Sequence, residues 1–199
     1  MKTTLEPHPD PPSDFAARPL PITIHRRCWF RIHRLARDPL YFGRSGDNRF
    51  DAPDGEFGVL YVGKDARCAF IEALGHATGV RLVEQAELAA RGLARIAPRR
   101  PLRLVNLAGE GLARIGADAR LTSGESYEVA HRWALAIHDH PKRPDGIAYA
   151  ARHDPSRVSA ALFERASAEL EVAILGSLAD PAHASLLGSL LDTYRFGLV

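Results

Sequence analysis

Short apolar runs separated by turn residues alternate along the chain with longer segments of helical periodicity. The runs predict strands at Thr23–Arg31, Val59–Val62, Leu102–Leu107, Gly146–Arg152, Ser159–Glu164 and Leu170–Leu175. Helices are predicted from Asp65 to about Thr78, near Glu125–Ile137, and from Pro181 to about Arg195, and the alanine- and arginine-rich stretch 80–100 is predicted as helix and turn. Because these elements do not alternate as regular β-α-β units, their order favours an α+β fold.

Two segments lack such a pattern. Residues 1–21 contain six prolines (Pro7, Pro9, Pro11, Pro12, Pro19 and Pro21), so we expect either a flexible arm or one laid along the surface. Residues 22–199 are expected to form one domain, since the sequence shows no repeat and no second composition class. The stretch 38–58 is rich in glycine and polar residues, and loops of this length inside a compact domain are often functional.

The predicted helix after Asp65 carries apolar residues on most of its surface, which is typical of a buried helix. Asp65 is a suitable N-cap. Glu72 is the only acidic residue between Asp65 and Glu84. Its side chain therefore lies either on a solvated flank of the helix or in a cleft.

Composition excludes several classes of protein. The 199 residues are 46% hydrophobic and 25% charged, and no apolar run approaches the length of a membrane span. The N-terminus has no basic start followed by an apolar stretch, so we expect the protein to remain in the cytoplasm. Cys28 and Cys68 are predicted as small core residues in a reducing compartment. The net charge of +2, with the basic residues spread out, gives no nucleic-acid footprint, and no direct nucleic-acid binding is expected.

Familiar catalytic motifs are absent from the sequence. It has no glycine-rich dinucleotide turn, no phosphate-binding P-loop and no nucleophile elbow. His138, Asp139 and His140 are crowded, but no further ligand has the spacing of a known metal site. We therefore expect no metal.

Arg49, Tyr61 and Glu72 stand in three successive elements, and each alone has an ordinary structural explanation. Together, the blocks that contain them resemble one family. These blocks are residues 41–51 (YFGRSGDNRFD), 58–62 (GVLYV) and 65–72, followed by 102–107, the helix from Ser126 to Trp133, and 145–152 (DGIAYAAR). The chain beyond the proline-rich arm is similar to the RES-domain family, which supplies the toxins of bacterial RES–Xre toxin–antitoxin pairs.

The resemblance implies an ADP-ribosyltransferase-like fold, with a central split mixed β-sheet flanked by helices. It also implies attack on the nicotinamide–ribose bond of NAD+, which is consumed as a substrate and is not a cofactor. By matching motif, Glu72, Tyr61 and Arg49 form the catalytic set, and Arg31 and Arg152 join Arg49 and Tyr61 in binding NAD+. The implied partner is an Xre-type helix-turn-helix antitoxin, through which any DNA contact is made.

One position departs from the family pattern. A serine usually precedes the arginine of the later strand, whereas this chain has Ala151. Ser126 and Ser156 are candidate substitutes, and nothing in the sequence selects between them.

The implied chemistry suits a single acid. Nicotinamide leaves NAD+ as a neutral molecule, so no second carboxyl group is needed to protonate it, unlike in ordinary glycoside hydrolysis. One carboxylate, Glu72, would stabilise the positive charge that develops on the ribose. Tyr61 would lay its ring against nicotinamide with its hydroxyl as a polar handle, and the arginines would hold the pyrophosphate.

Three hypotheses follow from this resemblance. The leading one is a toxin that depletes NAD+ by hydrolysis or phosphorolysis. The second is a mono-ADP-ribosyltransferase that modifies a host protein. The third, favoured by Ala151, is a catalytically inert binding module.

Overall fold

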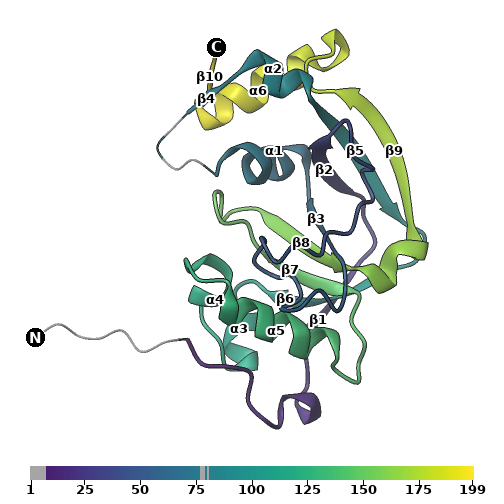
Figure 1. Cartoon of the computed structure of the whole chain (residues 1–199), viewed down its shortest axis with the longest axis vertical. Helices are drawn as coiled ribbons and strands as arrows, with labels where there is room; N and C mark the ends of the chain where they lie inside the picture. Colours follow the sequence, from purple (N-terminus) through teal and green to yellow (C-terminus); the bar gives the residue numbers. More distant parts are fainter. Residues whose placement is uncertain (1–7, 77–78, 80) are drawn as a thin grey trace, which may run out of the picture.

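A computed structural model describes residues 8–76, 79 and 81–199 of the chain (Figure 1). The strands are β1 (Ile22–His25), β2 (Trp29–Arg34), β3 (Val59–Gly63), β4 (Leu82–Val83), β5 (Arg91–Pro98), β6 (Leu102–Leu107), β7 (Gly146–Ala150), β8 (Val158–Phe163), β9 (Leu170–Ser177) and β10 (Gly197–Leu198). The α-helices are α1 (Ala66–Leu74), α2 (Gln85–Ala89), α3 (Glu110–Ile115), α4 (Arg120–Ser123), α5 (Glu128–His138) and α6 (Ala184–Tyr194). Short 3₁₀ helices are η1 (Phe15–Ala17), η2 (Glu164–Glu169) and η3 (Pro181–His183).

Eight strands form one mixed sheet in the order β1-β6-β7-β8-β3-β2-β5-β9. Only β6 and β7 run parallel within it. β2 and β3 pair at a single position, Phe30 opposite Gly63, whereas β3 pairs with β8 at five positions. The sheet is therefore split into two halves, β1-β6-β7-β8-β3 and β2-β5-β9, as the family resemblance implied.

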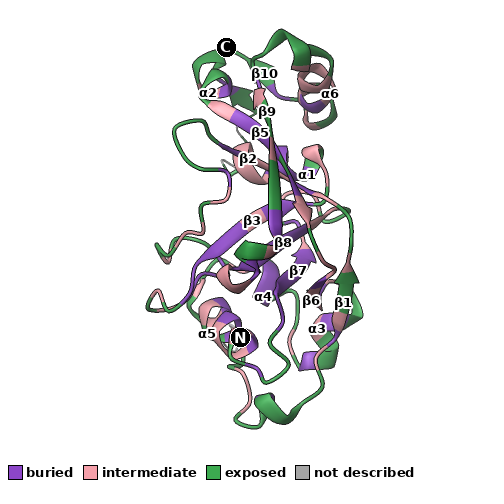
Figure 2. Cartoon of the chain, turned by 90° about the vertical axis from the view of Figure 1, so that its right-hand side faces the viewer, coloured by how far each residue is buried: buried purple, intermediate pink, exposed green. Residues whose placement is uncertain are grey.

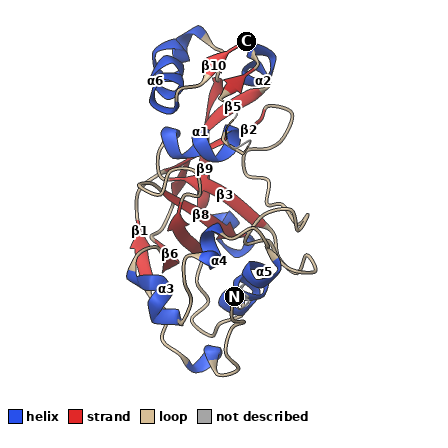
Figure 3. Cartoon of the chain, turned by 90° about the vertical axis from the view of Figure 1, so that its left-hand side faces the viewer, coloured by secondary structure: helices blue, strands red, loops and turns tan. Residues whose placement is uncertain are grey.

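Three apolar clusters hold these elements together. One lies between the half-sheets and joins Trp29 of β2 and Ile96 of β5 to Leu60 of β3. A second packs α5 against the larger half-sheet through Trp133 and Ile137. A third packs α1 and α6 against β2 and β5. Figure 2 shows the buried residues concentrated on the central strands, and Figure 3 shows helices at both ends of the sheet, α2 and α6 at one and α3, α4 and α5 at the other.

The connection from β3 to α1 follows from its local sequence. The Asp65 carboxylate caps the helix by accepting a hydrogen bond of 2.8 Å from the Cys68 amide. A Cβ at Gly63 would lie 2.6 Å from the Ala69 backbone nitrogen, so only glycine lets the helix pack this closely on the strand. The predicted N-cap is confirmed. The helix ends at Leu74, and the predicted end near Thr78 lies outside the described residues.

Two predictions of secondary structure are wrong. The stretch predicted as helix and turn contains β4, α2 and the eight-residue strand β5. Alanine and arginine favour helices, but β5 is paired on both sides, by β2 and β9, and its burial in the sheet overrides that propensity. The strand predicted at Thr23–Arg31 is two strands, since β1 pairs with β6 while β2 belongs to the other half-sheet.

Residues 8–21 lie along the surface of α5. Phe15 is buried with its ring 5.2 Å from that of Trp133, edge to face. The Trp133 indole donates a hydrogen bond to the Pro9 carbonyl oxygen at 3.0 Å, and Arg132 pairs with Asp10. Of the two alternatives for the proline-rich arm, these contacts correspond to the surface-bound one for the described residues. Within the described part of the chain, no helix is long and apolar enough to cross a bilayer.

Candidate functional site

A cleft of about 410 Å³ opens where β2 and β3 separate. α1, the loop before β3, α4 and the segment after β7 complete its walls. All five residues named from the sequence line this cleft: Arg31, Arg49, Tyr61, Glu72 and Arg152. The split in the sheet thus gathers residues from five parts of the chain: β2, the loop before β3, β3, α1 and the segment after β7.

Glu72 projects from α1 into the cleft and is half-buried. Its Oε1 accepts a hydrogen bond from the His153 backbone amide at 3.2 Å. Burial raises the pKa of Glu72, while the His153 amide and the neighbouring His76 and Arg152 act in the opposite direction. Of the two positions open to Glu72 on sequence grounds, the structure shows the cleft.

Arg49 is buried and fixes the far wall. Its Nη2 donates to the Gly124 carbonyl oxygen at 2.6 Å, its Nη1 donates to that of Leu121 at 3.5 Å, and the guanidinium lies over the Tyr127 ring at 4.6 Å from the centroid. Burial lowers the pKa of Arg49, but a guanidinium stays protonated in proteins. Arg49 therefore brings a permanent positive charge to the cleft and also anchors the segment after α4.

Tyr61 is joined to the loop that carries Arg49. Its hydroxyl accepts a hydrogen bond from the Phe50 amide and donates one to Asp51, both at 2.9 Å. Burial and the nearby Asp51 raise the pKa of Tyr61 well above its ordinary value. Since the hydroxyl is engaged by the loop, the ring is the part of Tyr61 available to a ligand.

Arg31 lies in the middle of β2, which corrects its predicted place at a strand end. Its Nη1 donates to the carbonyl oxygens of Pro39 and Tyr41, at 3.0 and 3.1 Å. Burial lowers the pKa of Arg31 to about 10. Arg152, in contrast, is exposed at the rim of the cleft. The two arginines therefore differ, one supporting a loop and the other facing solvent.

Other residues line the cleft without having been singled out from the sequence. Ser159 is buried, and its hydroxyl lies 3.3 Å from the Cys68 sulfur and interacts with Tyr149, its register partner on β7. Burial raises the pKa of both Tyr149 and Cys68, the latter to about 11. A lone serine in an otherwise apolar strand was the available signal for Ser159.

The two serines considered as substitutes for the hydroxyl lost at Ala151 do not line the cleft. Ser126 is exposed, and the Ser156 hydroxyl donates to Asp154 at 2.6 Å. Ala151 itself is buried. The serines that do line the cleft are Ser45 and Ser159.

The histidines at the end of α5 have separate structural partners. His138 stacks on Phe57 with ring centroids 4.0 Å apart and pairs with Asp139. His140 is buried and contacts the Arg18 carbonyl oxygen through Nε2 and the Lys142 amide through Nδ1. Both imidazoles thus take part in packing around the arm and α5.

Positively charged side chains predominate in the cleft. Five arginines line it, Arg31, Arg37, Arg49, Arg91 and Arg152, together with His76 and His153. Glu72 is the only carboxylate among the described lining residues. Such a cleft suits a ligand with anionic groups along its length and developing positive charge at one point.

Comparisons with known proteins show the family and the fold of the chain. A protein of Sinorhizobium fredii described as "Probable toxin y4kH" is 33% identical over 114 residues, which is 57% of this chain and 87% of that protein. A chain in the crystal structure of the M. tuberculosis MbcT–MbcA toxin–antitoxin complex is similar with a TM-score of 0.62 and 16% identity, over 88% of this chain and 93% of that one. This likeness and the split sheet confirm the predicted ADP-ribosyltransferase-like α+β fold. The RES domain model matches residues 28–182, and the chain therefore belongs to the RES domain family.

Proposed function

We propose that this protein is the toxin of a toxin–antitoxin pair and that it cleaves the nicotinamide–ribose bond of NAD+. The observation that carries the proposal is a single half-buried carboxylate, Glu72, in a cleft lined by five arginines. NAD+ has the complementary features, a diphosphate and a ribose that becomes positively charged as nicotinamide departs. The toxin role is supported by family membership and by the described likeness to a probable toxin.

The reaction requires one carboxylate. The bond between ribose C1′ and the nicotinamide nitrogen breaks, and its electron pair stays on nicotinamide, which leaves as a neutral molecule. Glu72, ionised, faces the sugar and stabilises the oxocarbenium-like transition state by its charge. An oxygen of water or inorganic phosphate then bonds to C1′, and water releases its proton to the solvent.

The other residues bind and orient NAD+ in this scheme. Arg152 at the rim and Arg49 on the far wall hold the diphosphate by charge-assisted hydrogen bonds. The Tyr61 ring packs against nicotinamide. Arg31 keeps the 39–41 backbone in place, which shapes the same wall. Such fixed contacts let binding energy from the phosphates act at the ribose.

An enzyme that consumes NAD+ in its own cytoplasm needs an inhibitor. We propose an Xre-type helix-turn-helix antitoxin that occludes the cleft, with contact to promoter DNA made only by that partner. The structural relative was solved as a toxin–antitoxin complex, which supports an antitoxin partner. We expect a small helix-turn-helix reading frame beside the gene, and co-expression of its product should restore growth that the chain alone arrests. Continued arrest with both proteins present contradicts this pairing.

The enzymatic proposal is tested with purified protein and NAD+. Replacing Glu72 with Gln keeps shape and removes charge, and we expect a rate lower by about 10²–10³. Glu110→Gln is the matched control, because Glu110 is an exposed helical acid on α3, outside the cleft lining. Equal rates for wild type and Glu72→Gln would remove Glu72 from this role. No NAD+ loss by the wild type, together with normal growth, would support the inert binding module.

The acceptor is identified with NAD+ labelled in the ADP-ribose part and incubated with cell lysate. Depletion releases soluble labelled product, as free ADP-ribose with water or as a phosphorylated ADP-ribose that appears only with inorganic phosphate. A labelled protein band instead indicates the mono-ADP-ribosyltransferase.

A further inference from the structure

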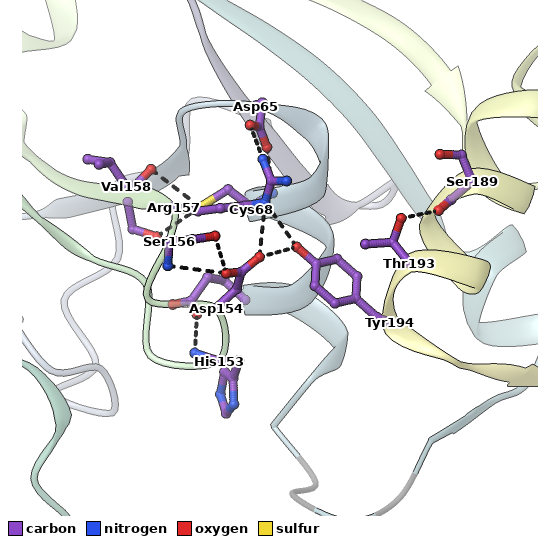
Figure 4. A network of polar contacts seen from close by, with 12 residues as sticks. Asp65, Cys68, His153, Asp154, Ser156, Arg157, Val158, Ser189, Thr193 and Tyr194 are labelled. Atoms are coloured by element: carbon purple, nitrogen blue, oxygen red, sulfur yellow. Dashed lines mark hydrogen bonds and ion pairs between the residues drawn. The ribbon is translucent and has the colours of Figure 1, made fainter.

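The loop between β7 and β8, residues 151–157, connects the cleft to the C-terminal helix. Arg152 and His153 line the cleft. Arg157 and Asp154, on the same short loop, contact the N-cap of α1 and the last residue of α6, respectively (Figure 4). The position of the loop therefore depends on elements outside the cleft.

Three side chains close this contact into a network. The Tyr194 hydroxyl donates to Asp154 Oδ2 at 2.9 Å. Arg157 Nε donates to the same oxygen at 3.0 Å and to the Tyr194 hydroxyl at 3.2 Å. Every pair of the three is thus hydrogen-bonded, and burial together with Asp154 raises the pKa of Tyr194 to about 12. The network is therefore held with Tyr194 protonated at neutral pH.

The network also reaches the start of α1. Arg157 Nη1 forms an ion pair with Asp65, the residue whose carboxylate caps that helix. The Tyr194 ring stacks on Phe70 of α1, with centroids 6.2 Å apart and planes 8° from parallel. The loop, α1 and the last residue of α6 are in this way fixed to one another.

Glu72 lies on the same helix and takes a hydrogen bond from the loop. The His153 amide that donates to Glu72 directly precedes Asp154, so a displacement of Asp154 moves the amide. The other charged or titratable groups facing Glu72 are His76 after α1, Arg152 on the loop, Tyr149 on β7 and Cys68 on α1 itself. Among the groups that lower the pKa of Glu72, the His153 amide has the largest effect.

We propose that Tyr194 is a positioning residue, which through Asp154 and Arg157 fixes the β7–β8 loop and so holds the His153 amide against the Glu72 carboxylate. Tyr194 follows the segment matched by the RES domain model, residues 28–182. In this proposal α6 orders the site through Tyr194. The effect of Tyr194 on catalysis rests on the proposed function. Its effect on the Glu72 carboxyl group can be measured without turnover.

The test is a titration of the Glu72 carboxyl group by NMR in the full chain labelled at glutamate Cδ, with Glu72→Gln identifying the signal. Tyr194→Phe removes one oxygen and keeps the ring stacked on Phe70. We expect the pKa of Glu72 to rise by about 0.5–1 unit, since a hydrogen bond to the charged form is weakened. Thr193→Ala is the matched control: Thr193 is exposed beside Tyr194, and its hydroxyl donates to Ser189 at 2.7 Å, within α6.

An unchanged Glu72 pKa in a folded Tyr194→Phe protein, or an equal rise in Thr193→Ala, would overturn the proposal. Asp154→Asn provides a second variant if Tyr194→Phe fails to fold, with the same expected direction. In turnover, the acid limb of kcat/KM for NAD+ should move to higher pH in Tyr194→Phe and stay in place in Thr193→Ala. A pKa shift in a protein whose wild type leaves NAD+ intact would retain the positioning role and reject the proposed reaction.

Discussion

The Tyr61 hydroxyl donates a hydrogen bond to Oδ1 of Asp51 at 2.9 Å, and Asp51 is fully buried. The second carboxylate oxygen accepts from the backbone and side-chain nitrogens of Asn48, at 3.1 and 3.0 Å. Arg49 and Phe50 lie between Asn48 and Asp51 in sequence. The hydrogen bond from Tyr61 of β3 to Asp51 therefore helps to set the shape of the turn that carries Arg49. Tyr61 thus contributes to the cleft through its ring and through the backbone that it organises.

Tyr61→Phe should accordingly destabilise the protein. The change removes the donor to buried Asp51 and the acceptor of the Phe50 amide, and leaving such groups unsatisfied costs about 1–3 kcal/mol. Urea unfolding measures this as a lower midpoint at unchanged slope. Tyr41→Phe is the control, since the Tyr41 side chain is 52% exposed. Equal midpoints for both variants would show that the Tyr61–Asp51 bond adds nothing to stability.

Glu72→Gln should stabilise the fold at neutral pH while it lowers the rate of NAD+ cleavage. Burial raises the pKa of Glu72 above its ordinary 4.5, so between the two values the folded state binds more protons than the unfolded state. Stability contributed by this group is therefore present below about pH 4.5 and lost as pH rises through the folded-state pKa. The gain in Tm from Glu72→Gln should be larger at pH 8 than at pH 4, by calorimetry.

Ionisation of Glu72 lowers stability but is required for activity, so the two should change in opposite directions with pH. The ionised form stabilises the ribose cation, so kcat/KM should fall as pH drops through the raised pKa of Glu72, with a midpoint above 4.5. A midpoint at or below 4.5, or a Tm difference between Glu72→Gln and wild type that shrinks with rising pH, would contradict the burial assigned to this carboxyl group.

Elements with complete local signals were predictable. α1 has its cap at Asp65, its close approach at Gly63 and an apolar stripe, all within a dozen residues. β5 has none of these: its arginines and alanines fit a helix, and only pairing with β2 and β9 makes it a strand. The break between β1 and β2 at residues 26–28 likewise depends on their separate partners.

Some residues of the candidate site could likewise be predicted from the sequence, and others could not. The family resemblance identified Arg49, Tyr61 and Glu72 together, because it depends on the separations between the sequence blocks that contain them. Sequence alone left Glu72 between solvent and cleft, because the answer depends on where His153 lies, 81 residues further along the chain. Ser159 is a lone serine in an apolar strand, but its sequence position does not show that the strand borders the cleft, so it was missed.

Arg152→Ala should weaken the grip on a diphosphate without unfolding the protein. Arg152 is exposed at the rim, and losing one charged hydrogen bond of about 1.5 kcal/mol raises a dissociation constant about tenfold. Calorimetric titration with ADP-ribose measures this, and the loss should shrink at high salt. Arg99→Ala is the control, because Arg99 pairs with Glu171 at the surface, outside the cleft lining. Unchanged affinity in Arg152→Ala would leave phosphate binding to the deeper arginines.

Phe15→Ala tests how firmly the N-terminal arm is held. Phe15 is 4% exposed and contacts both Trp133 and His140 edge to face, with centroids 5.2 and 5.7 Å apart. Removing a buried phenyl ring costs about 3–5 kcal/mol when the surroundings cannot close the cavity, and less when a mobile segment moves in. We expect about 3 kcal/mol here, because η1 is free of the sheet and adjusts in part.

Ile24→Ala, at a residue 53% exposed on β1, serves as the control and should cost far less. The Trp133 indole N–H, bonded to the Pro9 carbonyl oxygen, gives a second measurement, since its hydrogen exchange should quicken in Phe15→Ala as the arm loosens. Equal losses for Phe15→Ala and Ile24→Ala, with unchanged indole exchange, would mean that the arm rests on α5 without stabilising it.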